Sequence, residues 1–228
     1  RAMSFATAQD AFFAEFFRRY PVHATNAGNH EHDDRWPDVT DAGTGARLAW
    51  LAEARAGLEA ADGLTREEEI DRRVLVSVID EMRFEEEELD EPSWSAITYS
   101  YLLGGGLFAL LSREFAPLAQ RLQSAAGRME GIPAVLDAAR ANLTSGRSRP
   151  VARFHVEKAI ETIPGVADLC RTAVAMAADV DEELRARVTS ASDGAVAAVD
   201  SFAAWLRDEL LPAADGGFRL GPHLYDRK

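Results

Sequence analysis

The 228-residue sequence predicts an all-α protein, a multi-helix array or bundle, on three observations. Apolar residues recur at three- and four-residue spacing over most of the chain, the period of helices that bury one face. Alanine is abundant and β-branched residues are scattered, which favours helix over strand. The prolines fall where a first turn or a break tolerates them.

The first helix is expected from about Ser4 to Tyr20, with phenylalanines along one face and Pro21 ending it. The following segment, 22–44, has no useful periodicity and contains several glycines and a proline. We interpret 22–44 as a long ordered loop, since loops of that length in compact domains are usually functional.

Helical spacing resumes over about 45–61. Thr65 and Glu68 fit a capping box, in which each side chain satisfies a backbone N–H of the other residue. The helix that this box opens is predicted to continue to about Glu88, before Pro92. It is expected to bury one stripe, formed by Ile70, Val74, Val78 and Met82 and flanked by Leu75 and Ile79.

The second half is less regular at its start. Ile97-Thr98-Tyr99 has strand-like residues, so any strand is confined to 95–103 or to the segment around His30. The glycines at 104–106 are predicted to interrupt or kink a helix. Further helices are expected over 113–129, 132–143, 150–178 and 182–211.

The formal charge, 25 − 38 = −13, repels phosphate backbones and so excludes nucleic acid as an expected partner, and it disfavours anionic membranes. No stretch approaches eighteen consecutive apolar residues, so no membrane partner is expected. Cys170 is the single cysteine, which fits a reducing compartment. Arg1-Ala2-Met3 does not resemble a signal peptide. The expected location is cytoplasmic, with removal of a signal peptide as the alternative.

Potential metal ligands concentrate in Asn29-His30-Glu31-His32-Asp33-Asp34. His30-Glu31-x-x-Asp34 is a degenerate form of a zinc-peptidase motif, in which residues i and i+4 share a helical face. The flanking Gly28 and Pro37 disfavour a regular helix there. We therefore interpret the segment as a structural loop whose side chains cap helix ends and bond one another. If the loop is functional, His30 and Asp34 are the residues to test.

Two other patterns are not assigned to a functional site. The glycines at 104–106 lack the strand and the Lys-Ser/Thr of a phosphate loop, so close helix packing is the default interpretation. Cys170 and His155 could form a nucleophile and base, but Cys170 lies in an apolar run typical of a core. No catalytic residue and no metal ligand is assigned, no cofactor is expected in this chain, and whether it is an enzyme stays open.

Several patterns together resemble a bacterial family of unknown function, DUF885. Its opening signature is similar to Tyr20-Pro21 followed by Gly28-Asn29-His30-Glu31-His32-Asp33-Asp34-Arg35-Trp36-Pro37-Asp38. This sequence departs from it with His32 at an aromatic position and Trp36 at a leucine. Two later segments agree, Arg128-Met129-x-x-Ile132-Pro133 and Phe218-Arg219-Leu220-Gly221.

The resemblance implies a helical fold related to gluzincin zinc peptidases, in which a His-Glu-x-x-His helix and a downstream Glu hold zinc. This sequence contains no such motif. Residues 1–228 are therefore expected to be a single helical region, the amino-terminal scaffold and one substrate-cleft wall of a longer protein that could carry zinc. The substrate or loop candidates are His30, Asp33, Asp34 and Arg35.

The expected partners are the carboxy-terminal half of the same protein, a peptide substrate, and a second copy through apolar surface left uncovered. A stand-alone helical binding module, acting through 22–44 or an exposed groove, is the rival interpretation. A third is a small enzyme that uses His30 and Asp34 with a metal. A reading frame that continues past Lys228 to a His-Glu-x-x-His motif favours the first; a stop after Lys228 favours the second.

Overall fold

The computed structural model describes residues 4–227. It confirms the all-α prediction: in these residues no strand forms, and the sole isolated β-bridge there joins Ala152 to Gly216. Arg1-Ala2-Met3, at which no signal peptide was expected, lie outside the described residues. No helix in the described part has by itself the length and apolar character needed to cross a membrane.

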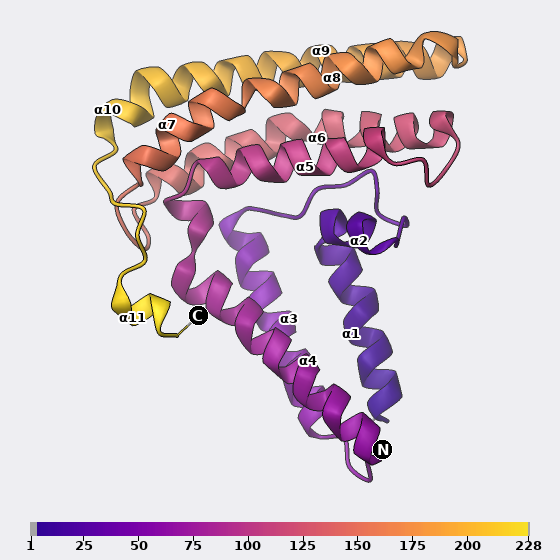
Figure 1. Ribbon diagram of the computed structural model, residues 1–228, viewed down its shortest axis with the longest axis vertical. Coiled ribbons are helices and arrows are strands. Elements are labelled where there is room, and N and C mark those ends of the chain that lie inside the picture. Colours follow the sequence, from indigo (N-terminus) through magenta and orange to yellow (C-terminus); the bar gives the residue numbers. More distant parts are fainter. Residues whose placement is uncertain (1–3, 228) are drawn as a thin grey trace.

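The helices lie in two groups (Figure 1). One group, the body, contains α5, α6, α8 and α9 side by side; the other, the arm, contains α1, α3 and α4 and projects away from it. In chain order the elements are α1 (Phe5–Arg19), α2 (Pro21–Ala27), α3 (Asp41–Glu59), α4 (Arg66–Phe84), the π-helical η1 (Glu85–Leu89), the 3-10 turn η2 (Glu91–Ser93), α5 (Ile97–Ser112), α6 (Leu118–Thr144), α7 (Arg153–Thr162), α8 (Pro164–Met176), η3 (Ala177–Asp179), α9 (Glu182–Trp205), η4 (Leu206–Leu210), α10 (Leu211–Ala213) and α11 (Pro222–Tyr225).

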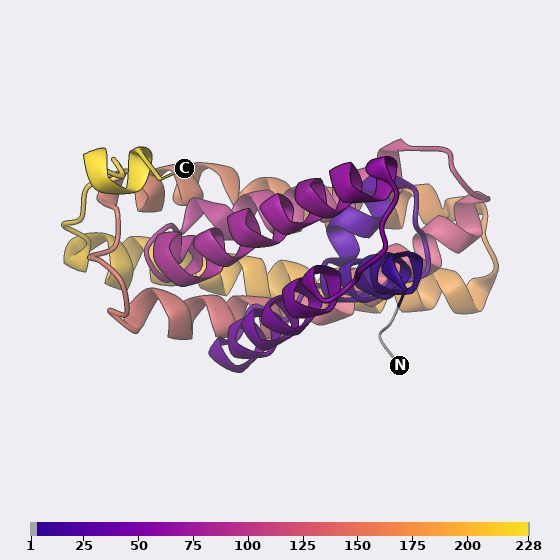
Figure 2. The same ribbon diagram turned by 90° about the horizontal axis from the view of Figure 1, so that it is seen from below.

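Each group has its own apolar core. The arm buries Phe12, Leu51, Leu58 and Ile79, and the Phe12 ring stacks on Trp50 at 5.4 Å. The larger core of the body is formed mainly by α5, α6, α8 and α9, with fully buried leucines, valines and alanines. Seen from below, the two long helices of the arm, α3 and α4, cross the body obliquely (Figure 2).

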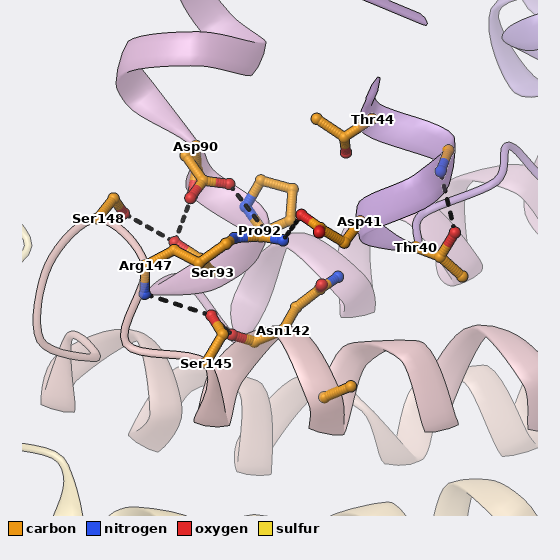
Figure 3. Close-up of polar contacts among 12 residues, drawn as sticks. Thr40, Asp41, Thr44, Asp90, Pro92, Ser93, Asn142, Ser145, Arg147 and Ser148 are labelled. Carbon is orange, nitrogen blue, oxygen red and sulfur yellow. Dashed lines mark hydrogen bonds and ion pairs between the residues drawn. The ribbon is translucent and has the colours of Figure 1, made fainter. Parts of the chain in front are cut away.

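Polar contacts join the arm to the body (Figure 3). Arg147, after α6, donates to Asp41 at the start of α3 (2.5 Å) and to Asp90 after η1 (3.1 Å). On α6, the Asn142 amide donates to the Val39 carbonyl at 2.7 Å and to the Tyr99 hydroxyl at 2.9 Å. These contacts hold the start of α3 and the segment after η1 against the end of α6, so the arm is joined to the body at one end of its helices.

The predicted loop over 22–44 is shorter in the structure and covers 28–40. Pro21 does not end helical structure; it opens α2, because a proline in the first turn forfeits no helical hydrogen bond. Gly28 ends α2 with a φ of 87°, a conformation that glycine adopts without strain. The Thr40 hydroxyl accepts from the Gly43 N–H at 3.0 Å and so starts α3 earlier than expected.

Other helix boundaries also differ from the predictions. No strand forms over 95–103, and α5 continues through the glycines at 104–106 without a break. The helices expected over 113–129 and 132–143 are one helix, α6, with Pro133 inside it. Burial of Ile132 and Val135 beside the proline offsets the lost hydrogen bond. The helix expected over 150–178 divides at Pro164 into α7 and α8.

The face that α4 buries was predicted wrongly. Ile70, Val74 and Val78 are 53%, 56% and 38% exposed, while Leu75 and Ile79 form the buried side. Two apolar stripes lie next to each other on this helix, and helical periodicity alone cannot choose which one meets α3.

Candidate functional site

The loop over 28–40 is held by a buried polar network. The His30 Nδ1 atom lies 2.9 Å from Asp33 Oδ2, and the His30 ring stacks on Phe115 with 3.8 Å between centroids. Asp33 is 4% exposed, and its Oδ1 accepts from the Thr25 hydroxyl at 2.5 Å. These contacts support the interpretation of a structural loop.

Arg128 of α6 is the centre of this network and is fully buried. Its guanidinium donates to Thr25 Oγ1 at 2.7 Å, to the Gly106 carbonyl at 2.5 Å and to the Arg35 carbonyl at 3.3 Å. It also lies 5.3 Å over the Trp36 ring. Burial lowers the pKa of Arg128 to about 10, against the opposing field of nearby carboxylates. The sequence contained a signal for this buried arginine, because Arg128 lies on the same helical face as the apolar residues that α6 buries.

Of the four candidate residues, His30 and Asp33 meet in the interior of the loop, and Asp34 and Arg35 lie on the surface. The side chains of Asp34 and Arg35 are 55% and 61% exposed and form a surface pair at 3.6 Å. In residues 4–227, no group of three or more His, Cys, Asp or Glu is arranged to hold a metal ion. The zinc that the resemblance implies therefore does not fit the described residues, and no step through zinc is derived for them.

A hollow of about 530 Å³ lies elsewhere, between α1/α2 and α4. Its apolar walls include Phe16, Val78 and Met82, and a cluster of three hydrogen-bonded polar side chains also lines it. Arg47 of α3 donates to both Glu86 oxygens, at 2.5 and 2.8 Å, and Tyr20 donates to Glu86 Oε1 at 3.2 Å.

The hollow is electrostatically negative. Its lining carries one guanidinium, Arg47, and four carboxylates: those of Glu81, Glu85, Glu86 and Glu91. Burial and the Glu86 charge raise the pKa of the Tyr20 hydroxyl, so it stays protonated.

His23 lines the same hollow as an exposed residue, 5.9 Å from the Tyr20 ring and 6.2 Å from the Phe16 ring. Burial lowers its pKa, so the imidazole is neutral at neutral pH. Among the described residues it has no hydrogen-bond partner, which leaves both ring nitrogens available to a ligand.

A second hollow, about 410 Å³, continues from the first. It shares Tyr20, His23, Arg47, Glu86 and Thr98 with it and extends to α5, where Tyr101, Leu102 and Gly105 line it. Pro37 and Val39, at the end of the 28–40 loop, form another side. The loop therefore shapes the cleft with its last residues, whereas the residues that sequence reasoning selected lie outside this lining. The pair of Arg47 and Glu86 was missed, since 39 positions separate them along the chain.

The fold and these hollows define an all-helical protein with an open, acidic, partly aromatic cleft. The model of the family described as "Bacterial protein of unknown function (DUF885)" matches residues 21–228, and the chain belongs to this family. The resemblance drawn from the sequence is thereby confirmed at the level of the family. No curated protein matches the chain.

A solved structure, described as a putative lipoprotein of unknown function from Shewanella oneidensis, is similar to this chain. The TM-score is 0.87 and the sequence identity 26%, over 99% of this chain and 42% of that chain. The chain thus spans less than half the length of this neighbour.

The expectation of a cytoplasmic location is contradicted by this neighbour, because a lipoprotein points to the cell envelope. A single cysteine does not identify the compartment of a protein. One buried thiol, Cys170, excludes an intrachain disulfide but is compatible with a reducing or an oxidising compartment.

Proposed function

We propose that this chain is the helical scaffold and one wall of a substrate cleft in a longer, zinc-metallopeptidase-like protein associated with the cell envelope. The observation that carries the proposal is the cleft between α1/α2, α4 and α5, which the described residues shape but leave open. The length of the similar lipoprotein, of which this chain covers 42%, supports the existence of a further part.

The exposed stripe on α4 supports the same proposal. Ile70, Val74 and Val78 follow each other at four-residue spacing, and Val78 also lines the first hollow. Apolar side chains that continue from a cleft along an exposed helix are typical of a surface that another segment or ligand covers.

The lining fits a peptide better than a small polar metabolite. Phe16, Val78 and Met82 offer apolar contact for side chains, and the neutral His23 imidazole can donate to a carbonyl or accept from an amide. Arg47 is occupied by Glu86 and by the Asp38 carbonyl, so its part is to hold the wall in place. No catalytic group is assigned to this wall.

The test uses the full-length gene product and a synthetic random-sequence peptide library, with cleavage followed by mass spectrometry. Val78→Arg places a long cationic side chain in the hollow and is expected to reduce cleavage at least tenfold. Ala186→Arg, at an exposed position on α9, adds the same charge outside the cleft and should leave cleavage unchanged.

Equal cleavage by both variants would show that the wall is elsewhere, and a full-length protein that cleaves no peptide would refute the metallopeptidase-like function. The rival, a stand-alone binding module, keeps support from the open cleft. It would be favoured by a reading frame that ends at Lys228. Binding of a partner through the 28–40 loop has less support, since Arg128 and Asp33 hold that loop by buried hydrogen bonds.

A further inference from the structure

The sixteen residues of α5, Ile97–Ser112, include no charged side chain, although Lys, Arg, Asp and Glu make up 28% of the sequence. One side of α5 is buried in the body, through residues such as Leu103, Leu107 and Leu110. The other side is exposed, with Tyr101 at 67% and Phe108 at 59%. A surface helix normally carries charged residues on its solvent side, so an uncharged exposed face is typical of a helix that is covered.

Glycines form the middle of this exposed face. A Cβ added at Gly104 or at Gly105 would meet nothing within 4 Å. Gly106 differs, because a Cβ there would collide with the Trp36 ring. Close helix packing was expected of these glycines, and Gly106 shows it, because the Trp36 ring packs against it. At Gly104 and Gly105, no atom of residues 4–227 occupies the space where a side chain would begin.

A groove of about 390 Å³ runs along these glycines, between α5 and α8. Gly165, Val166 and Leu169 of α8 form its other side, and a Cβ at Gly165 would also meet nothing within 4 Å. The groove thus has a floor of small residues, and Tyr101 and Phe108 flank the glycines along α5. Small floors of this kind let a second helix approach the backbone closely.

Ser100, one residue before Tyr101, carries a buried hydroxyl beside the groove. It lines the same groove, is 5% exposed, and its hydroxyl has no hydrogen-bond partner among the described residues. Buried hydroxyls in folded proteins are nearly always paired.

We propose that this groove docks a helix contributed by the polypeptide that follows Lys228. The proposal rests on the premise of the proposed function, that a longer protein exists. The end of the described chain supports this occupant: Arg227 contacts Glu88 at 2.5 Å and lies 5.6 Å over Phe84, on η1 and α4. The chain therefore ends beside α4, on the side of the molecule where α4 and α5 lie in front of α3 and α6 (Figure 1).

Substitution of Gly105 tests whether the groove is covered, because the melting temperature should rise if the groove is open and fall if a helix covers it. In the 228-residue chain, Gly105→Leu should raise the melting temperature by roughly 2–4 °C, because leucine forms helix better than glycine and has open space here. In the full-length protein the same change should lower the melting temperature, because the added side chain occupies the space of the docked helix.

The matched control is Gly45→Leu on α3. Gly45 is also exposed and open and lines none of these hollows, so the change should raise the melting temperature at both lengths. An equal rise for Gly105→Leu at both lengths would overturn the proposal. A reading frame that ends at Lys228 would do so as well.

Thiol labelling gives a second measurement that does not depend on stability. Cys170 is fully buried and burial raises the pKa of its thiol to about 11, so an introduced cysteine is the reactive thiol of the 228-residue chain. Tyr101→Cys should react with a maleimide at least tenfold more slowly in the full-length protein than in the 228-residue chain, measured by peptide mass spectrometry. Ala186→Cys should react equally in both.

Equal labelling of Tyr101→Cys at both lengths would contradict docking on α5. Val78 lines the cleft and not this groove. If Val78→Arg reduced peptide cleavage while Tyr101→Cys was labelled equally at both lengths, the proposed cleft wall would stand and the docking site would be rejected.

Discussion

Replacement of Arg128 by methionine should destabilise the protein and make the 28–40 loop more mobile. Methionine fills similar space but cannot donate, so Thr25 Oγ1 and the Gly106 carbonyl lose bonds of 2.7 and 2.5 Å to a charged donor. Bonds to charged groups contribute about 1.5–3 kcal/mol each. Their loss is partly offset, because burial of the guanidinium is itself unfavourable, as its lowered pKa indicates.

We expect Arg128→Met to lower the free energy of unfolding by ~3 kcal/mol, which for a chain of this size corresponds to a fall of roughly 6–12 °C in melting temperature. Amide hydrogen exchange, followed by mass spectrometry, should rise within 28–40, because the Arg35 carbonyl and the Asp33 network lose their anchor.

Arg121→Met is the matched control. Arg121 is also buried, 6% exposed, but its acceptors are the carbonyls of Leu110, Leu111 and Ala116, all around the connection of α5 to α6. It should destabilise the protein while leaving exchange within 28–40 unchanged. A loss below ~1 kcal/mol for Arg128→Met, or equal loop exchange in the two variants, would refute the assignment of Arg128 as the residue that holds the loop.

Three further predictions follow from the loop, the cleft and the α4 stripe. The purified 228-residue chain should retain no stoichiometric zinc after dialysis, and His30→Ala with Asp34→Ala should leave its elemental analysis unchanged; one equivalent of zinc that disappeared in this double variant would support the small-enzyme alternative. Burial lowers the pKa of His23 in the folded state, so the unfolded state binds a proton more readily. The free energy of unfolding should therefore be highest above the unfolded pKa of about 6.5 and should decrease as the pH falls toward the folded pKa. His23→Phe should flatten that fall in urea titrations between pH 7 and 5, and an unchanged slope would exclude His23 as a source. The 228-residue chain should self-associate at high concentration through the α4 stripe, and Ile70→Glu with Val74→Glu should make it monomeric by light scattering without loss of helicity, since both side chains are more than half exposed; a wild-type chain that is strictly monomeric would contradict this.

The local features of this protein could be predicted from the sequence. The capping box is formed as expected: the Thr65 N–H donates to Glu68 Oε2 at 2.8 Å and the Glu68 N–H donates to the Thr65 hydroxyl at 3.2 Å. Such signals involve residues three positions apart, whose geometry is set by the helix itself. The family resemblance and the absence of strands in 4–227 were likewise within reach of motifs and periodicity.

The candidate site could be predicted only in part. The sequence selected His30, Asp33, Asp34 and Arg35, and of these His30 and Asp33, three positions apart, form a hydrogen bond. A substrate-cleft wall was expected from the family resemblance, but its residues were not identified: Arg47 and Glu86 come from different helices. The bond between Arg128 and Thr25, 103 positions away, was not predicted either. Contacts between distant residues depend on how helices pack, which the local pattern does not encode.

What the sequence determined by itself is therefore that the chain is helical, acidic, of the DUF885 family, and apolar along particular stripes. Only the tertiary structure decided which stripe each helix buries. On α4, Leu75 and Ile79 meet α3 while Ile70 and Val74 remain exposed, although all four fit a helical period. The physical reason is that burial is decided by the neighbour that a face meets, and that neighbour is fixed by the packing of the whole chain.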